Sequence, residues 1–221
     1  MRNNIPVQGD AVSYDHYTSS FLAAYDRVFV SRVVEEYRPR AVQQRLVDIG
    51  TGTARVLTQL AERPELRDLD LVGTEFFDDM VEAAKKTVHE SGLTSRIEIV
   101  YADVHAMPHP DGHFHYLISR STLHHWAQPI VALKEIYRVL APGGVGIIHD
   151  LRRDPEEKAL EAFNRIRHEA GLGPTRIEEK YTISETRALL EEAGIWQDCS
   201  IYAPMTGRGA VGYELTIRKH Q

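Results

Sequence analysis

Residues 46–61, which read LVDIGTGTARVLTQLA, decide the fold. An apolar run ends, Gly50 and Gly52 follow on either side of Thr51, and an amphipathic pattern begins at once. Glycine lets the backbone approach a ligand closely, and a helix that begins there presents unpaired N–H groups at its positive end. The stretch therefore predicts a strand, a helix from about residue 53, and a nucleotide-like ligand at the turn between them.

Three features of this turn narrow the class of ligand. The dinucleotide fingerprint needs glycine or alanine where this chain has Arg55, and no Gly-Lys-Ser/Thr ending marks a P-loop. Asp48 lies on the strand, two residues before Gly50. Its carboxylate would repel a pyrophosphate and attract an amine. We therefore expect a ligand that carries an amino group and no phosphates.

Short apolar runs, rich in valine and isoleucine, recur along the first 150 residues. Continuous runs of this kind are typical of strands that are covered on both faces. They lie at 45–50, 69–75, 97–103, 115–119 and 144–150. One helical stripe between them consists of Phe77, Met80, Val81, Ala84 and Val88. A further helix should begin at Pro129 and end before Gly143. The alternation predicts an α/β fold with a doubly wound, mostly parallel sheet.

Two segments lie outside this alternation. Near the N-terminus a helix is predicted from an apolar face made of Phe21, Tyr25, Val28, Phe29 and Val33. After residue 150, residues 154–170 show a helical pattern, and a second helix has a capping box from Thr182 to Glu185 and a stop at Gly194. The runs at 197–205 and 211–219 predict a closing antiparallel pair of strands.

Composition excludes several classes of protein. The 221 residues include 43% hydrophobic residues and have a formal net charge of −6, which suits one folded domain and disfavours binding to free nucleic acid. The first ten residues lack a signal-peptide pattern, and no apolar run reaches the roughly 20 residues of a membrane span, so we expect a cytoplasmic protein. Cys199 is the only cysteine, and the spacing of His105, His109 and His113 is not that of a ligand pair on a helix, so we expect no metal.

Acidic residues end three consecutive predicted strands. Asp48 is followed by Glu75, which could accept both hydroxyls of a ribose, and by Asp103, which could accept an adenine amino group. Phe76 could lie against the adenine. S-adenosylmethionine has an ammonium, a sulfonium, a ribose and an adenine, and it matches all of these positions.

The chain resembles the class I S-adenosylmethionine-dependent methyltransferases, in particular the branch of the ubiquinone and menaquinone biosynthesis methyltransferases. The resemblance lies in the ordered set VDIGTGTARV, LVGTEFFDDMVEAA, YADVHAMPHPDGHFHYLIS, STLHHW and LKEIYRVLAPGGVGIIHD. The resemblance covers about residues 45–150 and implies a seven-stranded sheet. Two positions depart from the family pattern, namely Ala54 in place of a frequent glycine and His115 in place of an acid. The implied cofactor contacts are Asp48, Gly50, Thr51, Gly52, Glu75, Phe76, Asp103, Val104 and Ser119.

The resemblance also implies a domain organisation and candidate catalytic residues. Residues 1–40 would form an N-terminal helical lid, and residues 41–221 the methyltransferase domain with a cap insertion at about 151–181. His124 and His125 would lie beside the transferred methyl group, where either could act as a general base or only order the loop. In the lid, Tyr14 and Tyr17 could close over the cofactor or pack the helix onto the sheet.

Absent motifs favour a small-molecule acceptor, methylated at O, N or C. After the fourth predicted strand the chain has SRST, which is not the motif of the amino-methylating DNA enzymes. Cationic side chains in the cap could bind an acidic acceptor or could only be solvated: Arg152, Arg153, Arg165, Arg167 and His168. The alternatives are methylation of a tRNA or other macromolecule with a partner subunit, and a protein that binds S-adenosylmethionine without transferring a methyl group. Either a monomer or a homodimer is compatible with the sequence.

Overall fold

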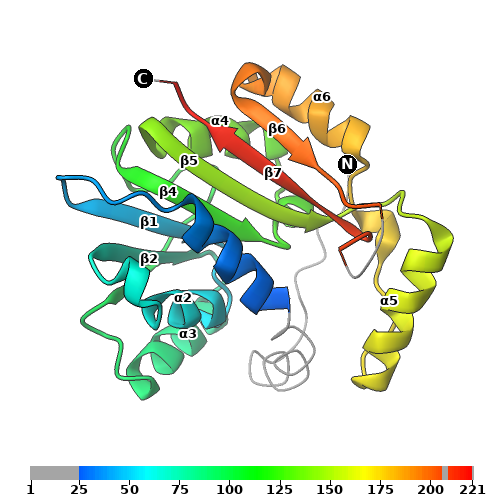
Figure 1. Cartoon of the computed structure of the whole chain (residues 1–221), viewed down its shortest axis with the longest axis horizontal. Coiled ribbons are helices and arrows are strands. Elements are labelled where there is room, and N and C mark those ends of the chain that lie inside the picture. The colour runs from blue at the N-terminus through cyan, green and yellow to red at the C-terminus, as the bar shows by residue number, and fades with distance from the viewer. Residues whose placement is uncertain (1–24, 206–208, 221) are drawn as a thin grey trace.

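The computed structural model describes residues 25–205 and 209–220 (Figure 1). Seven strands form one sheet in the order β3-β2-β1-β4-β5-β7-β6. β7 runs antiparallel to both of its neighbours, and the pairs among β1 to β5 are parallel, which confirms the predicted sheet. The strands are β1 (Gln44–Ile49), β2 (Leu69–Glu75), β3 (Ile97–Tyr101), β4 (Phe114–Arg120), β5 (Leu140–Leu151), β6 (Cys199–Tyr202) and β7 (Gly212–Arg218).

Helices cover both faces of this sheet. On one face, α2 (Arg55–Ala61), α3 (Asp78–Glu90) and the helix of residues 25–36 pack together, and on the other face α4 (Pro129–Val139) and α6 (Ile183–Ala193) do so. Neighbouring residues of β1 point to opposite faces. Leu46 packs in the core beneath α2 and α3, and Val47 packs in the core beneath α4 and α6. The sheet is thus buried on both sides, as its continuous apolar runs predict.

The helix of residues 25–36 packs on the sheet through Phe29, Val30 and Val33, which are all buried. The expected face was wrong at Val28, whose exposed fraction is 72%. At about 100° per residue, Val28 is rotated far from the stripe that Phe29 and Val33 define, and Val30 takes its place. Phe21 lies outside the described residues.

The end of α4 differs from the prediction at Gly143. The helix ends at Val139, and β5 already begins at Leu140, which pairs with Phe114 of β4. The next registered pair is Tyr116 with Val145, so the intervening residues form an irregularity in the strand. Gly143 has a φ of 70° there and donates its N–H to the carbonyl of Lys219. It is therefore a bulge residue and not a helix stop.

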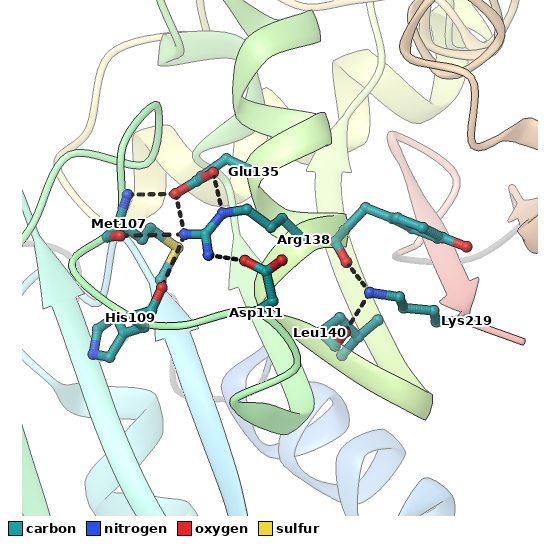
Figure 2. Close-up of polar contacts among 8 residues, drawn as sticks. Met107, His109, Asp111, Glu135, Arg138, Leu140 and Lys219 are labelled. Carbon is teal, nitrogen blue, oxygen red and sulfur yellow. Dashed lines mark hydrogen bonds and ion pairs between the residues drawn. The ribbon is translucent and has the colours of Figure 1, made fainter. Parts of the chain in front are cut away.

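A polar cluster fastens α4 at the amino ends of the strands (Figure 2). The Arg138 guanidinium donates to both oxygens of Glu135, to Asp111, and to the carbonyls of Met107 and His109. Glu135 in turn accepts from the Met107 N–H at 2.7 Å. The cluster ties the loop between β3 and β4 to α4, and it leaves the opposite end of the sheet free for a site.

The segment after β5 leaves the sheet and returns to it. α5 (Glu157–Glu169) stands beyond the carboxyl ends of the strands, apart from the other helices (Figure 1). The chain comes back through a short 3₁₀ turn, η3 (Ile177–Glu179), and Tyr181 forms a parallel bridge with Arg152. α6 then begins with the predicted capping box, in which Thr182 and Glu185 bond each other's backbone N–H. Each described helix is too short or too polar to cross a lipid bilayer.

Candidate active site

The strand order reverses between β1 and β4, which are neighbours in the sheet. From β1 the chain proceeds to β2 and β3 on one side, and from β4 it proceeds to β5 on the other. Ligands of open α/β sheets bind beyond the carboxyl ends of the strands at this kind of switch point. The candidate residues Asp48, Glu75 and Ser119 lie at or next to these ends.

The turn after β1 has three residues in the left-handed region, with φ values of 67° at Gly50, 57° at Gly52 and 62° at Ala54. A Cβ on Gly50 would lie 2.7 Å from Cγ2 of Thr122, whereas nothing lies within 4 Å of a Cβ on Gly52. Both Gly50 and Thr51 donate their N–H groups to the Thr74 carbonyl at 2.9 Å. α2 begins at Arg55, two residues later than expected, because Ala54 still has a left-handed φ.

Asp48 is a buried acid beneath this turn, with an exposed fraction of 3%. The pKa of its carboxyl is raised to about 7. Burial is the main cause and the negative charge of nearby Glu75 adds to it, whereas the hydrogen bond from Thr51 acts in the opposite direction. The Thr51 hydroxyl donates to Oδ2 at 2.8 Å. A cation bound at this place would favour the ionised carboxylate, so the group suits a ligand with positive charge.

Glu75 ends β2 and faces the same turn. Its Oε2 accepts from the Gly52 N–H at 3.0 Å, and its Oε1 accepts from the N–H groups of Phe76 and Phe77 at 2.8 and 3.3 Å. A carboxylate has about four acceptor positions, so the backbone already uses three. Glu75 is thus held rigidly in place, with one position left for a ligand hydroxyl.

Aromatic side chains lie next to Glu75. Phe76 is 48% exposed, and its ring contacts those of Phe77 and Tyr101, each with centroids 5.7 Å apart. Phe77 was expected in the buried stripe of α3, but it precedes that helix and is 40% exposed. An exposed aromatic cluster at the carboxyl end of β2 is a suitable surface for a flat ring.

Asp103 follows β3, and one of its two carboxylate oxygens is already bonded within the protein. Its Oδ1 accepts from the backbone N–H of His105 and contacts the Nδ1 of the same residue. Burial raises the pKa of this carboxyl, but the bonds from His105 outweigh that effect and lower the pKa below its ordinary value. Because the His105 Nε2 accepts from the Gln128 N–H, Asp103 also helps to fix the start of α4. Val104 packs against the core at its side.

Ser119 is fully buried in β4. Its hydroxyl donates to the Ile49 carbonyl at 2.9 Å and is also bonded to the Thr122 hydroxyl. These bonds lock the loop after β4 against the end of β1. Any contact of Ser119 with a ligand would therefore involve its main chain.

The loop after β4 carries His124, which forms a dyad with Asp150 at the end of β5. The His124 Nδ1 lies 2.8 Å from both oxygens of the Asp150 carboxylate, and the His124 N–H donates to Oδ2 at 3.1 Å. Both side chains are buried, with exposed fractions of 5% and 1%. Burial would raise the pKa of Asp150, but the interactions with His124 hold it below its ordinary value. The ionised carboxylate thus keeps the proton on Nδ1 and leaves Nε2 as an acceptor.

The His125 ring lies against that of His124, with a centroid distance of 3.9 Å and an interplanar angle of 47°. Burial, with smaller contributions from His124 and from the positive charge of Lys180, lowers its pKa to about 4. It is therefore neutral at physiological pH. Among the described residues, a carboxylate is hydrogen-bonded to His124 and none to His125.

The other sequence candidates are placed less favourably. Tyr14 and Tyr17 lie outside the described residues. In the cap, Arg152 pairs with Asp154 at 2.9 Å, and Arg153 pairs with Glu185. The Arg167 Nε donates to the Gly173 carbonyl at 2.8 Å. These three arginines are thus engaged within the protein.

His115 is the second departure from the family pattern. Its Nδ1 accepts from the Arg45 N–H at 3.3 Å, next to the start of β1. The His115 side chain therefore lies at the amino end of the sheet and not in the candidate site.

Sequence reasoning missed a further link between elements. Buried Asp26 accepts a hydrogen bond from Arg55 at 2.7 Å and forms an ion pair with Arg120. This link fixes the helix of residues 25–36 to the starts of α2 and of the loop after β4.

A surface groove of about 580 Å³ lies elsewhere, between the helix of residues 25–36 and the end of α2. Arg27, Gln59, Glu62 and Arg63 are among the residues that line it. None of them belongs to the strand ends, so the groove is separate from the candidate site. Within residues 25–205 and 209–220, no three potential metal ligands of the His, Cys, Asp or Glu type converge.

Comparison with known proteins agrees with this geometry. The seven-stranded, mostly parallel sheet is that of the Rossmann-like S-adenosylmethionine-dependent methyltransferase fold. A methyltransferase from Methanococcus maripaludis, described as dependent on S-adenosyl-L-methionine, has this fold with a TM-score of 0.70 and 23% identity, over 96% of this chain and 92% of that one. Residues 47–148, from β1 to β5, match the family model described as a methyltransferase domain.

Two curated relatives are methyltransferases of small molecules by name. The chain is 28% identical over 157 residues to 27-O-demethylrifamycin SV methyltransferase of Amycolatopsis mediterranei, covering 71% of this chain and 56% of the relative. It is 32% identical over 113 residues to demethylmenaquinone methyltransferase of Thermus thermophilus, covering 51% and 50%. The chain thus spans about half the length of these relatives.

Proposed function

We propose that the protein is an S-adenosylmethionine-dependent methyltransferase that acts on a small-molecule acceptor. The observation that carries the proposal is Asp48, a buried acid with a raised pKa beneath a glycine turn at the switch point of the sheet. This arrangement suits a cationic ligand and disfavours a phosphate. The methyltransferase domain over residues 47–148 and the names of the curated relatives support the same activity.

The residues that would hold the cofactor are those at the strand ends. Asp48 and the turn of Gly50, Thr51 and Gly52 suit its amino-acid part, and Glu75 suits the ribose. Phe76, Asp103 and Val104 suit the adenine, and Ser119 keeps the loop after β4 closed against the turn. When bound, S-adenosylmethionine supplies a methyl group on a sulfonium, a leaving group that needs no activation.

His124 is the general base in this proposal. Asp150 holds the proton on Nδ1, so Nε2 can accept the proton of an acceptor hydroxyl or N–H as that atom is methylated. The positive charge that then develops on the imidazole is stabilised by the ionised Asp150 carboxylate. Among O, N and C acceptors, this dyad favours those that lose a proton from oxygen or nitrogen. His125, which is neutral, packs beside the base.

Two measurements test the proposal. Calorimetry should detect binding of S-adenosylmethionine and S-adenosylhomocysteine to the purified protein, and a panel of phenolic and alcoholic acceptors should yield S-adenosylhomocysteine. The absence of cofactor binding by folded protein would end the proposal. Cofactor binding without turnover of any small acceptor, including extracted metabolites, would favour a protein that binds S-adenosylmethionine without transferring its methyl group. Turnover on extracted RNA alone would favour a macromolecular acceptor.

The remaining expectations belong to this proposal. Binding of a small metabolite needs no nucleic-acid surface and no membrane, and it is compatible with a cytoplasmic monomer or homodimer. The lid at residues 1–40 would cover the cofactor, and the cap at 151–181 would cover the acceptor. Tyr14 and Tyr17 remain candidates for closing over the cofactor.

A further inference from the structure

Lys180 is a buried cation at the point where the cap returns to the sheet. It follows η3, donates its N–H to the Ile177 carbonyl, and has an exposed fraction of only 6%. Lysine is almost never buried to this degree without a partner, because the ammonium loses its hydration. Its position therefore needs an explanation.

Within the described residues, the Lys180 ammonium donates no hydrogen bond to the protein. Its one ion pair, with Oε2 of Glu179, has a distance of 4.0 Å, which is too long for a hydrogen bond. The neighbouring arginines have closer acceptors, since Arg152 has Asp154 at 2.9 Å and Arg167 has the Gly173 carbonyl at 2.8 Å. Lys180 is thus a buried cation of the cap whose ammonium still has donors to offer.

The backbone brings Lys180 beside the His124 and Asp150 dyad. Tyr181 pairs in parallel with Arg152, and the Arg153 N–H donates to the Tyr181 carbonyl at 3.0 Å. In a parallel bridge the preceding residues of both segments are also neighbours, so Lys180 lies next to Leu151, which directly follows Asp150. The electrostatics agree, because the Lys180 charge acts on both Asp150 and His125.

We propose that Lys180 binds a carboxylate on the methyl acceptor, so that the acceptors are small hydroxy or amino acids whose carboxylate lies close to the methylated atom. The inference rests on the proposed function and names its substrate class. The carboxylate would complete the coordination of a partly desolvated ammonium, and a charge-assisted bond of this kind is worth about 1.5–3 kcal/mol, or about 10- to 150-fold in affinity. Lys180 would set specificity, while His124 receives the proton.

Matched pairs of probes test the inference. Hydroxybenzoates and hydroxynaphthoates are titrated into the S-adenosylhomocysteine-loaded protein by calorimetry, each beside its carboxamide. At least one carboxylate should bind about tenfold or more tightly than its amide. The preference should fall to about onefold in Lys180→Met and remain largely in Lys180→Arg. Lys158→Met is the control, because Lys158 is an exposed lysine of α5. Melting curves establish that each variant is folded.

The outcomes separate this inference from the proposed function. No carboxylate preference in any pair of the panel, or an unchanged preference in Lys180→Met, overturns the role of Lys180 even if the cofactor binds. Failure to bind S-adenosylhomocysteine overturns the proposed function instead. In that case the same titrations on the unloaded protein still decide whether Lys180 binds carboxylates.

Discussion

The Asp150 carboxylate lies 2.8 Å from the His124 Nδ1 through each of its two oxygens, and it also accepts the His124 backbone N–H. One buried acid thus fixes both the loop and the imidazole that the loop carries. The contact joins the ends of two adjacent strands, β4 and β5.

Replacement of Asp150 by Asn should impair turnover and leave cofactor binding intact. We expect a rate loss of about 10²- to 10⁴-fold, because the imidazole loses the group that fixes its tautomer and stabilises its charge. The measurement is S-adenosylhomocysteine formation with the best acceptor found. Nitrogen NMR of His124 should show the Nδ1–H form in the wild type and a mixture in the variant. His125→Asn is the control, and an equal rate loss there would contradict the role of the dyad.

Affinity for the cofactor should depend on pH through Asp48. Its pKa is raised to about 7, and a bound cation lowers it, so binding releases a proton. S-adenosylhomocysteine should therefore bind about tenfold more weakly for each pH unit below 7, until the pKa of the bound form is reached. Asp48→Asn should bind weakly and lose this dependence. A wild-type affinity that stays constant from pH 8 to pH 5.5 would show that Asp48 does not face the ligand.

Because of the same raised pKa, ionised Asp48 should lower the free energy of unfolding of the cofactor-free protein. A folded pKa above the ordinary value means that the folded state holds its proton more tightly, so stability falls as pH rises from about 4 to 7. At pH 8, Asp48→Asn should stabilise the free protein by on the order of 4 kcal/mol, since the pKa is raised from 3.8 to about 7 and each pKa unit is about 1.4 kcal/mol. The gain should shrink as pH falls toward 4. Urea unfolding at pH 8 and pH 5 measures it, and a destabilised variant at pH 8 would refute the account.

Ala54→Gly should stabilise the protein. Ala54 has a φ of 62°, a conformation that carries a penalty of about 1–2 kcal/mol for a residue with a Cβ. Glycine avoids the penalty but loses some chain entropy and the buried methyl group, so we expect a net gain of about 0.5–1 kcal/mol. Urea unfolding of both proteins is the measurement. A loss of stability would mean that packing of the Ala54 methyl outweighs the backbone strain.

Arg138→Met should destabilise the fold without weakening the site. Arg138 bonds two carboxylates and two carbonyls at the amino ends of the strands (Figure 2), so its loss should lower the free energy of unfolding by about 2–3 kcal/mol. Cofactor affinity should stay within about twofold, since the site is at the other end of the sheet. Lys134→Met, an exposed position of the same helix, should change neither quantity.

The strands and the glycine turn could be predicted because local pattern decides them. Continuous apolar runs predict buried strands, and a glycine pair at a strand end predicts a close backbone turn. The capping box from Thr182 to Glu185 was also confirmed, since it depends on residues three positions apart. The errors at Val28 and Gly143 concern which side a single residue faces and where a helix gives way to a strand, and tertiary packing settles both.

The partners of the site could not be predicted in this way. His124 and Asp150 are 26 positions apart, and only the register of β4 on β5 brings them together. Lys180 lies in an irregular segment, where periodicity gives no signal. Its neighbourhood follows from the bridge between Arg152 and Tyr181, which no sequence pattern marks.

That bridge also has an evolutionary consequence. Because Arg152 and Tyr181 touch, the 28 residues between them form a closed excursion whose two ends meet at one place on the sheet. Loop-closure entropy rises only slowly with length, so such an excursion can be lengthened, shortened or exchanged at a small energetic penalty while its anchor points stay fixed. Relatives of this chain could thus acquire new acceptors by replacing one detachable module, with the scaffold that holds the base left unchanged.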